Sequence, residues 1–408
     1  MRIIQFLLVF LGAAVLVVGS IFWINRDTFI SVFQNRAAIL EGSEWVEKTY
    51  SLGGLIEFMA EQPDHAALFS GPVDMNESHD SPENSGTPVE IRHGSHRIVP
   101  GGTLNNIFLL VAYAEQKQNG EIDPGSPVDS EKLQPFYIPG IDRRHQRKFT
   151  SWADEHESGP SLQQLVSYLV TSNDPAVADY LFFRLGEEYI FELASEYGGE
   201  LIEPPVPQFG LRMTALNQTE TRTLSGILSE LHDKDREDLL NEAVAVARDQ
   251  WNDPKPVEEK SVDAFQDQRD LHGLYPRLQP DRFAGLLSKI WTGGFISEDI
   301  SRSLRKMLFT PVEDRLMKPH VTEFAAQFDE RMGYMNGWSI ARPADDEQPL
   351  RVQVIMITDI PAGLWFHMNS NFMIRDFHNR MLYDSSMQNR AFRMLEDNGS
   401  ESHTLYLQ

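Results

Sequence analysis

The segments that read as β-strands lie near the two ends of this chain, and helical patterns fill the interval between them. Residues 65–73 and 89–99 read as two strands, and residues 331–342 and 350–360 read as a β-hairpin. Residues 352–357 are apolar enough for a strand that is buried on both faces. We therefore predict one α+β unit, whose antiparallel sheet combines N- and C-terminal strands and is packed with helices on both sides.

Apolar residues recur at helical spacing between the strands. The predicted helices are 104–118, 161–170, 176–185, 187–197, a charged region at 219–251, 280–291, 297–308 and 370–382. One helix has clear boundaries, because Pro280 is a start signal and Gly293-Gly294 a stop signal. Residues 28–61 are also largely helical, with an expected interruption at Gly53-Gly54, whereas residues 252–279 are polar and punctuated by proline.

The N-terminal run 3–24 contains no charged residue and is long enough to cross a bilayer as a helix. The alternative is a signal peptide that is cleaved near Val18-Gly19-Ser20. We favour an uncleaved anchor, because the apolar run continues through residues 21–24. We expect a single-pass protein of the cell membrane with a short N-terminus inside and a large periplasmic or extracellular domain outside.

We predict four parts along the chain. These are a transmembrane anchor at 1–26, a juxtamembrane helix at 27–50, the main domain at 51–385 with a helical insertion at about 208–278, and a C-terminal tail at 386–408.

The formal net charge is −24, which argues against a nucleic-acid partner. The chain has no cysteine, so disulfides and thiolate zinc sites are excluded. The histidines, including His93 and His96, show no metal-ligand spacing, and we expect no metal or cofactor. One stretch, 142–148, is strongly basic. It reads either as a solvated loop or as a contact for an anionic ligand or partner.

Three stretches carry recognisable motif frames. The first, VPGGTLNNIFLLVAYAEQKQNGEIDPGSPV, starts at Val99. The second, LVTSNDPAVADYLFFRLG, starts at Leu169. The third is FAGLLSKIWTGGFISEDISRSLRKML from Phe283, followed by YMNGWSI from Tyr334. In order and spacing they resemble the serine β-lactamase and penicillin-binding D-Ala-D-Ala peptidase superfamily, class A β-lactamases in particular, over about residues 51–385.

The motifs of that superfamily are Ser-x-x-Lys, Ser-Asp-Asn and Lys-Thr-Gly. The resemblance places Thr103 at the nucleophile's position and Asn106 at the lysine's position. It places Asn173-Asp174-Pro175 at Ser-Asp-Asn and Met335-Asn336-Gly337 at Lys-Thr-Gly. A shift of one residue in the second motif would make Ser172 the hydroxyl, so Ser172 stays a minor candidate.

The chemistry that the resemblance implies is acyl transfer, in which a serine attacks a carbonyl and a lysine one helical turn later accepts the proton. Thr103 keeps a hydroxyl, but the amide of Asn106 cannot act as a base near neutral pH. Asp174 suits a helix cap. Gly337 suits a strand that another group approaches closely. We therefore expect that the fold persists and that the catalytic apparatus is lost.

Two displaced candidates remain. Glu203-Pro204 faintly resembles the loop of class A enzymes that holds the deacylation base, although its spacing is off and a solvated loop is the simpler interpretation. The only Ser-x-x-Lys is Ser303-Leu304-Arg305-Lys306, and it fits an exposed helix face.

Three functions stay open. The first is a membrane-anchored pseudoenzyme of the cell envelope that binds a peptide, a peptidoglycan-derived muropeptide or a protein partner. The second is an active β-lactamase or D-Ala-D-Ala carboxypeptidase with rebuilt chemistry at Thr103 or Ser172. The third is a structural module whose acidic insertion docks a partner. In this third case residues 212–275 should be removable without loss of the fold.

Overall fold

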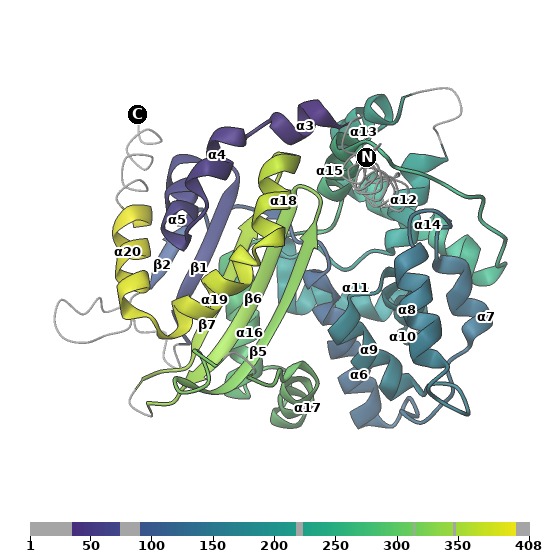
Figure 1. Cartoon of the computed structure of the whole chain (residues 1–408). Helices are drawn as coiled ribbons and strands as arrows, with labels where there is room; N and C mark the ends of the chain where they lie inside the picture. Colours follow the sequence, from purple (N-terminus) through teal and green to yellow (C-terminus); the bar gives the residue numbers. More distant parts are fainter. Residues whose placement is uncertain (1–34, 74–89, 218–222, 313–314, 346–347, 397–408) are drawn as a thin grey trace, which may run out of the picture.

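The computed structural model describes residues 35–73, 90–217, 223–312, 315–345 and 348–396 (Figure 1). Its centre is a five-stranded antiparallel sheet with the strand order β2-β1-β7-β6-β5. The strands are β1 Ala66–Pro72, β2 Ile91–His93, β5 Val321–Arg331, β6 Tyr334–Pro343 and β7 Arg351–Ile357. The predicted pairing of early with late strands is confirmed, because β1 pairs with β7 along seven residues from Ala66↔Ile357 to Pro72↔Arg351.

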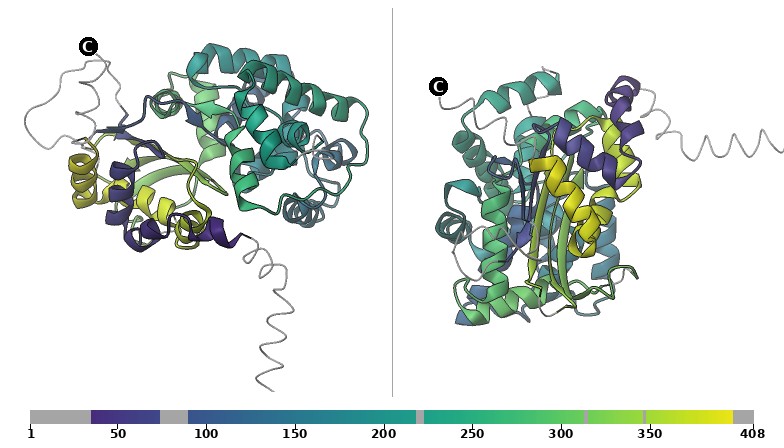
Figure 2. Two further views of the ribbon diagram at one scale, coloured as in Figure 1. Left: turned by 90° about the horizontal axis from the view of Figure 1, so that it is seen from above. Right: turned by 90° about the vertical axis from the view of Figure 1, so that its left-hand side faces the viewer.

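The central strands bury both of their faces. Along β7, Val352, Val354 and Met356 belong to one hydrophobic cluster, and Ile355 and Ile357 belong to another. This alternation is the period of two that a strand requires. Figure 2 shows the sheet edge-on between helices from the two chain ends on one side and helices from the middle of the chain on the other. The predicted α+β class with helices on both sides is thus confirmed.

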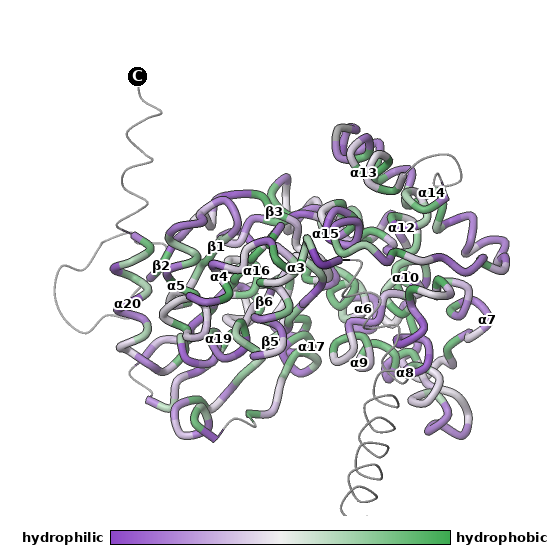
Figure 3. The backbone as a smooth tube through the Cα atoms, turned by 45° about the horizontal axis from the view of Figure 1, so that its top comes forward, coloured by the Kyte–Doolittle hydropathy of each residue, from purple (hydrophilic) through white to green (hydrophobic). Residues whose placement is uncertain are grey.

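Helices from the chain ends cover the first face. They are α3 Arg36–Leu40, α4 Ser43–Lys48, α5 Leu52–Glu61, α18 Ala362–Ser370, α19 Met373–Tyr383 and α20 Ser385–Glu396. Figure 3 shows polar and apolar residues alternating along surface helices such as α20, the pattern of a helix with one face on the core. In α20, Ala391 and Leu395 are that buried face.

Helices from the middle of the chain form the other layer, in which α16 packs directly against β7 and β1 and most of the remaining helices pack together beside the sheet (Figure 1). They are α6 Ile107–Asn119, α7 Ser130–Leu133, α8 Arg143–Ala153, α9 Leu162–Ser172, α10 Pro175–Leu185, α11 Glu187–Gly198, α16 Pro280–Thr292 and α17 Glu298–Leu308. Short 3-10 turns, η1 Leu104–Asn106, η2 Gln134–Phe136 and η3 Gly199–Leu201, join them. α6 is buried on nearly every side, so it is the central helix of this layer.

The insertion contributes α12 Gln208–Leu216, α13 Leu224–Asp233, α14 Arg236–Asn252, α15 Phe265–Gly273 and the short strand β4 Arg277–Leu278, which pairs with β3 Val99–Pro100. Its apolar residues belong to the same cluster as those of α6 and the sheet. This shared cluster argues against the expectation that residues 212–275 could be removed without loss of the fold, which stays a prediction.

Several elements differ from the predicted ones. Gly53-Gly54 lies inside α5, where a Cβ on Gly54 would meet the Lys48 carbonyl oxygen at 1.9 Å, so close helix packing explains the glycine. β5 and α15 were not predicted, because their mixed polar sequences lack a clear period. The basic stretch forms the start of α8 rather than a loop. The expected tail begins with the packed helix α20.

The expected transmembrane run 3–24 lies outside the described residues. Within the part of the chain that the structure describes, no helix combines the length and apolar character needed to cross a membrane.

Candidate functional site

The turn before α6 brings Thr103 beneath the sheet. Gly102 has a φ of +64°, and a Cβ there would meet the Asp329 Oδ2 atom at 2.1 Å. Glycine is required at this position because the backbone is left-handed and passes so close to a carboxylate. The turn then leads through η1 into α6, so Thr103 stands at the start of the predicted catalytic helix.

The backbone N–H of Thr103 donates to the Asp329 Oδ2 atom at 2.7 Å. The other carboxylate oxygen of Asp329 accepts from the Arg331 Nε atom at 2.7 Å. Arg331 also donates to the Tyr275 hydroxyl at 3.0 Å. Burial alone would lower the pKa of Arg331, but the charge of Asp329 outweighs it, so the pKa of Arg331 is raised. A side chain of the protein itself thus occupies the N–H at the position that the resemblance gives to the nucleophile.

Thr103 and its neighbours in η1 are cut off from solvent. Thr103 and Asn105 are 0% exposed and Asn106 is 7% exposed. Asn105 donates to the main-chain oxygens of Glu203 and Arg277, so its amide holds the segments around these two residues against η1. The Thr103 hydroxyl and the Asn106 amide nitrogen have no hydrogen-bond partner among the described residues.

The second motif forms the turn between α9 and α10. Asn173 adopts a left-handed φ of 49°, and its side chain bonds to the Phe328 oxygen and to Gln327, both on β5. Asp174 caps α10 by accepting from the N–H groups of Ala176 and Val177, which confirms the predicted capping role. Pro175 is the first residue of α10, a position where proline costs no hydrogen bond.

Ser172, the minor candidate, is committed to the same turn. Its hydroxyl donates to the Tyr168 carbonyl oxygen at 2.7 Å and accepts from the Asp174 N–H at 3.2 Å. The Tyr137 hydroxyl donates to Asp174, and burial together with that carboxylate raises the pKa of Tyr137. Each polar group of this turn thus serves the local fold.

The third motif is divided between the two faces of the sheet. Met335, placed by the resemblance at the position of a lysine, is fully buried on the face away from Thr103, in the cluster that contains Ile355 and Phe377. Asn336 points to the Thr103 side and donates to the Pro100 oxygen at 2.9 Å. A Cβ on Gly337 would meet the Phe328 ring at 2.5 Å, so a neighbouring aromatic ring explains this glycine.

The edge strand β5, and not the inner strand β6, therefore supplies most of the polar contacts to the first two motifs. Asp329, Gln327 and the Phe328 carbonyl all belong to β5. Their sequence signal was the pair Asp329 and Arg331, because opposite charges two residues apart share one face of a strand. The lack of apolar alternation in residues 321–331 hid this signal.

Glu203 is held by two arginines rather than by solvent. Its carboxylate accepts from Arg236 at 2.6 Å, and from the N–H and the Nε of Arg277 at 2.7 and 2.9 Å. Burial opposes the charge, but the two arginines outweigh burial, so the pKa of Glu203 is lowered. A carboxylate in this state is a poor general base.

The last part of the insertion, residues 265–278, contacts the β5–β6 turn and the turn before Thr103. His272 of α15 contacts the Met332 oxygen at 3.1 Å, and the left-handed Gly333 lies against the stem of Arg269. The Gly101 N–H donates to the Pro276 oxygen at 2.8 Å. Residues 265–278 thus pack against both the β5–β6 turn and the turn before Thr103.

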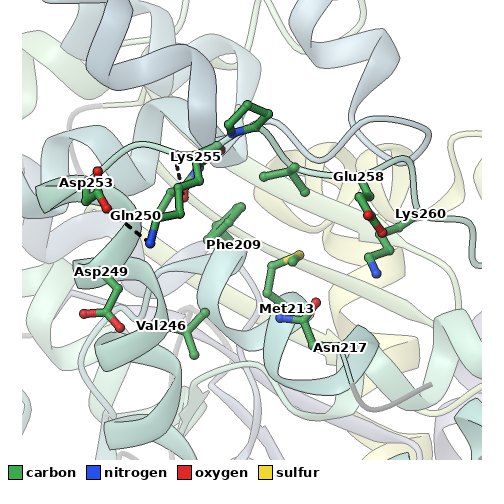
Figure 4. A pocket seen from close by; sticks show the side chains of 12 residues that line it. Phe209, Met213, Asn217, Val246, Asp249, Gln250, Asp253, Lys255, Glu258 and Lys260 are labelled. Carbon is green, nitrogen blue, oxygen red and sulfur yellow. Dashed lines mark hydrogen bonds and ion pairs between the residues drawn. The ribbon is translucent and has the colours of Figure 1, made fainter. Parts of the chain in front are cut away.

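The clearest hollows of the described residues lie away from Thr103. One of about 340 Å³ lies within the insertion, between α12, α14 and residues 253–260 (Figure 4). Another, of about 360 Å³, lies beside α17, and a third, of about 720 Å³, lies between α11 and α14. Thr103 lines none of these three.

The remaining candidates have structural roles. His93 is buried between the Met59 and Leu395 carbonyls, and burial lowers its pKa. Ser303 and Lys306 lie on α17, far along the chain from the cleft turns, and Lys306 is exposed. Within the described ranges, no group of three or more histidine, aspartate or glutamate residues is placed to hold a metal ion.

No protein-family model matches this chain, and no curated protein matches it. Solved structures of β-lactamases are similar to it in fold. A β-lactamase from Chitinophaga pinensis is 12% identical, with a TM-score of 0.46, over 85% of this chain and 99% of the other. A β-lactamase from Sphaerobacter thermophilus is 12% identical, with a TM-score of 0.43, over 86% and 98%. PBP-A is 12% identical, with a TM-score of 0.42, over 83% and 96%.

Proposed function

We propose that this chain is a β-lactamase-like protein that has lost acyl transfer and acts by binding a peptide, a muropeptide or a protein partner. One observation carries the proposal. The N–H of Thr103, at the nucleophile's position, is bonded to the Asp329 carboxylate, and the residue is 0% exposed. Acyl-transfer enzymes need such N–H groups free, because they stabilise the negative oxygen of the tetrahedral intermediate.

The loss extends beyond the nucleophile. Asn106 offers an amide where a base is required. Ser172 donates its proton to a main-chain oxygen, and Glu203 is paired with Arg236 and Arg277. A hydrolase rebuilt on Thr103 or Ser172 would need a base that none of these side chains provides. These contacts favour a binding role over the alternative of a β-lactamase or carboxypeptidase.

The site of action belongs to the same proposal. The uncharged run 3–24 would anchor the protein in the cell membrane, with the domain in the periplasm or outside the cell. Fractionation of cells that express residues 1–408 or 27–408 tests this. The longer chain should sediment with membranes and resist extraction with carbonate. A full-length chain released like the shorter one would contradict the anchor.

Acylation tests the loss of chemistry. Residues 27–408 are incubated with a fluorescent penicillin and analysed by intact-protein mass spectrometry, beside an active serine β-lactamase as the positive control. We expect no adduct on this chain and full labelling of the control, because covalent capture requires a competent nucleophile. Muropeptides or a protein partner should instead produce reversible thermal stabilisation.

The opposite result would be specific. An adduct on the wild-type chain that disappears in Thr103→Ala or in Ser172→Ala would identify the working hydroxyl. The chain would then be an active hydrolase, and the resident carboxylate of Asp329 would have to move during the reaction.

A further inference from the structure

The first two turns of α8 carry a cluster of positive charge on a strongly acidic protein. Arg143, Arg144, Arg147 and Lys148 are all exposed, and the chain as a whole has a net charge of −24. The residues recur at a spacing of four, so they form two adjacent stripes on the solvent side of the helix. Phe149, on the opposite side of α8, is 1% exposed and packs in the core.

Most of these charges are not neutralised within the protein. Arg143 pairs with Glu259 at 2.8 Å. In the part of the chain that the structure describes, Arg144, Arg147 and Lys148 have no carboxylate within 4.0 Å. The protein has many more acidic than basic residues, so carboxylates that could pair with these cations are abundant in the sequence. A free cationic cluster on such a surface is therefore a local departure from the rest of the protein.

The cluster also lies at the unfavourable end of its helix. The N-terminus of a helix carries positive partial charge, so cations there are repelled. The first turn of α8 contains no acidic residue, and the Asp142 side chain does not cap it. Both oxygens of that carboxylate are used elsewhere, by the Ile138 N–H and by Arg212. Helix stability does not explain these four residues, so a binding role is the better explanation.

We propose that the first two turns of α8 bind an acidic segment of a protein partner, a proposal that rests on the binding function argued above. Charge complementarity indicates the chemistry of the partner, because a row of several carboxylates matches the cations of the two stripes on α8. The surface is open rather than enclosed, since no α8 residue lines the three hollows described above. An extended strand therefore fits better than a single small anion.

A flat anionic membrane fits this surface less well. The helix is followed directly by the exposed carboxylates of Asp154, Glu155 and Glu157, which a plane touching α8 would also meet. The aromatic residues of α8 are engaged internally, since Trp152 stacks against Tyr168 and His156. An interfacial helix would instead present such residues to the lipid. A narrow strand can cross the first two turns without approaching the acidic residues.

The cluster lies beside the cleft. His145, in the middle of the basic stretch, is 3.6 Å from the Asp174 carboxylate, which caps α10 in the second motif. Arg143 reaches Glu259 of the insertion. A partner bound on α8 would therefore lie next to the turn between α9 and α10 and next to Glu259 of the insertion.

Charge reversal tests the proposal. The probe is a short fluorescein-labelled polyglutamate peptide, and binding to residues 27–408 is followed by fluorescence anisotropy at low and at raised salt. The test variant is Arg144→Glu with Lys148→Glu. The control is Arg282→Glu with Lys289→Glu, because these exposed cations lie on α16 and also lack an ion pair among the described residues. A second arm offers phosphatidylglycerol vesicles to the wild-type protein.

We expect the wild-type protein and the α16 variant to bind the peptide alike, with an affinity that falls as salt rises. The α8 variant should bind at least about tenfold more weakly. It should melt no lower than the wild type, because acidic residues suit a helix N-terminus. The proposal fails if the wild type does not bind the peptide, if the two variants bind equally, or if only the vesicles bind. An adduct in the penicillin experiment would overturn the loss of catalysis and leave this result untouched.

Discussion

At the scale of single residues, the polar groups around Thr103 are engaged in hydrogen bonds that hold the local fold together. The Asp329 carboxylate bonds to the Thr103 N–H, and the Asn105 amide bonds to two main-chain oxygens. Each of these polar groups is buried, where an unmade hydrogen bond costs far more than a made one gains. The structure around Thr103 therefore depends on the position of the Asp329 carboxylate. The backbone of Gly102 lies against that carboxylate, so a substitution at Gly102 measures how much stability the carboxylate contributes.

Gly102→Ala should destabilise the protein by about 3 kcal/mol. A Cβ at 2.1 Å from Oδ2 would displace the carboxylate and break its hydrogen bond to Thr103. The matched control is Gly120→Ala, because Gly120 has a similar φ of +71° and no atom within 4 Å of its Cβ. That variant should cost only the backbone strain, about 1 kcal/mol. Urea unfolding at pH 7 measures both. Equal losses would mean that Asp329 moves without cost.

At the scale of elements, the insertion is joined to the main layer through the start of α12. The Asp179 carboxylate, on α10, accepts from the N–H groups of Gln208 and Phe209, the first residues of α12. Arg212, on the same helix, reaches Asp142 at 2.6 Å in the interior. Burial raises the pKa of Asp179 to about 7, although the two N–H groups and Arg212 lower it. The carboxyl group that contacts α12 is therefore titratable near neutral pH.

The titration of Asp179 predicts a pH dependence with a definite sign. Because the folded pKa is raised from 3.8 to about 7, the protonated form stabilises the fold. This contribution is complete below the unfolded pKa and is lost as the pH rises through 7. From pH 5 to pH 8, the wild type should lose about 2 kcal/mol of unfolding free energy relative to Asp179→Asn. Urea unfolding of both proteins across this range is the measurement. A difference that is constant with pH would contradict the raised pKa.

At the scale of the whole molecule, the sequence predicted the architecture better than it predicted the site. Residues 352–357 are apolar except for Gln353, and this marked a doubly buried strand, which the structure pairs with an early strand. The β5 contacts to the motif positions were missed, because Gln327 and Asp329 are buried polar residues whose partners, Asn173 and the Thr103 N–H, lie far away in the chain. Only the fold brings such partners together. Met335, placed by the resemblance at the position of a lysine, lies on the face of the sheet opposite to Asn336, because successive residues of a strand face opposite sides.

The insertion was expected to be separable, but its contacts predict that it unfolds together with the main body. Trp251 of α14 lies 5.6 Å from the ring of Phe183 on α10 and 6.4 Å from that of Phe136 in η2, both stacked. A Cβ on Gly210 would meet the Ala243 carbonyl oxygen at 1.9 Å, so α12 and α14 are closely packed. One continuous hydrophobic cluster includes α14 and α6. Such a cluster should open as one cooperative unit.

Hydrogen exchange in urea, measured on the wild type and on Trp251→Ala, tests whether the insertion and the main body unfold as one cooperative unit. Truncation of a large aromatic side chain at a packed junction costs about 3 kcal/mol. If the molecule is one unit, the amides of α14 and of α6 should lose protection at the same urea concentration in the wild type. In the variant, both should lose about 3 kcal/mol of exchange free energy. A loss confined to α14, with α6 unchanged, would show that the insertion folds independently of the main body. The contact between residues 265–278 and the turn before Thr103 would then depend on the separate stability of the insertion.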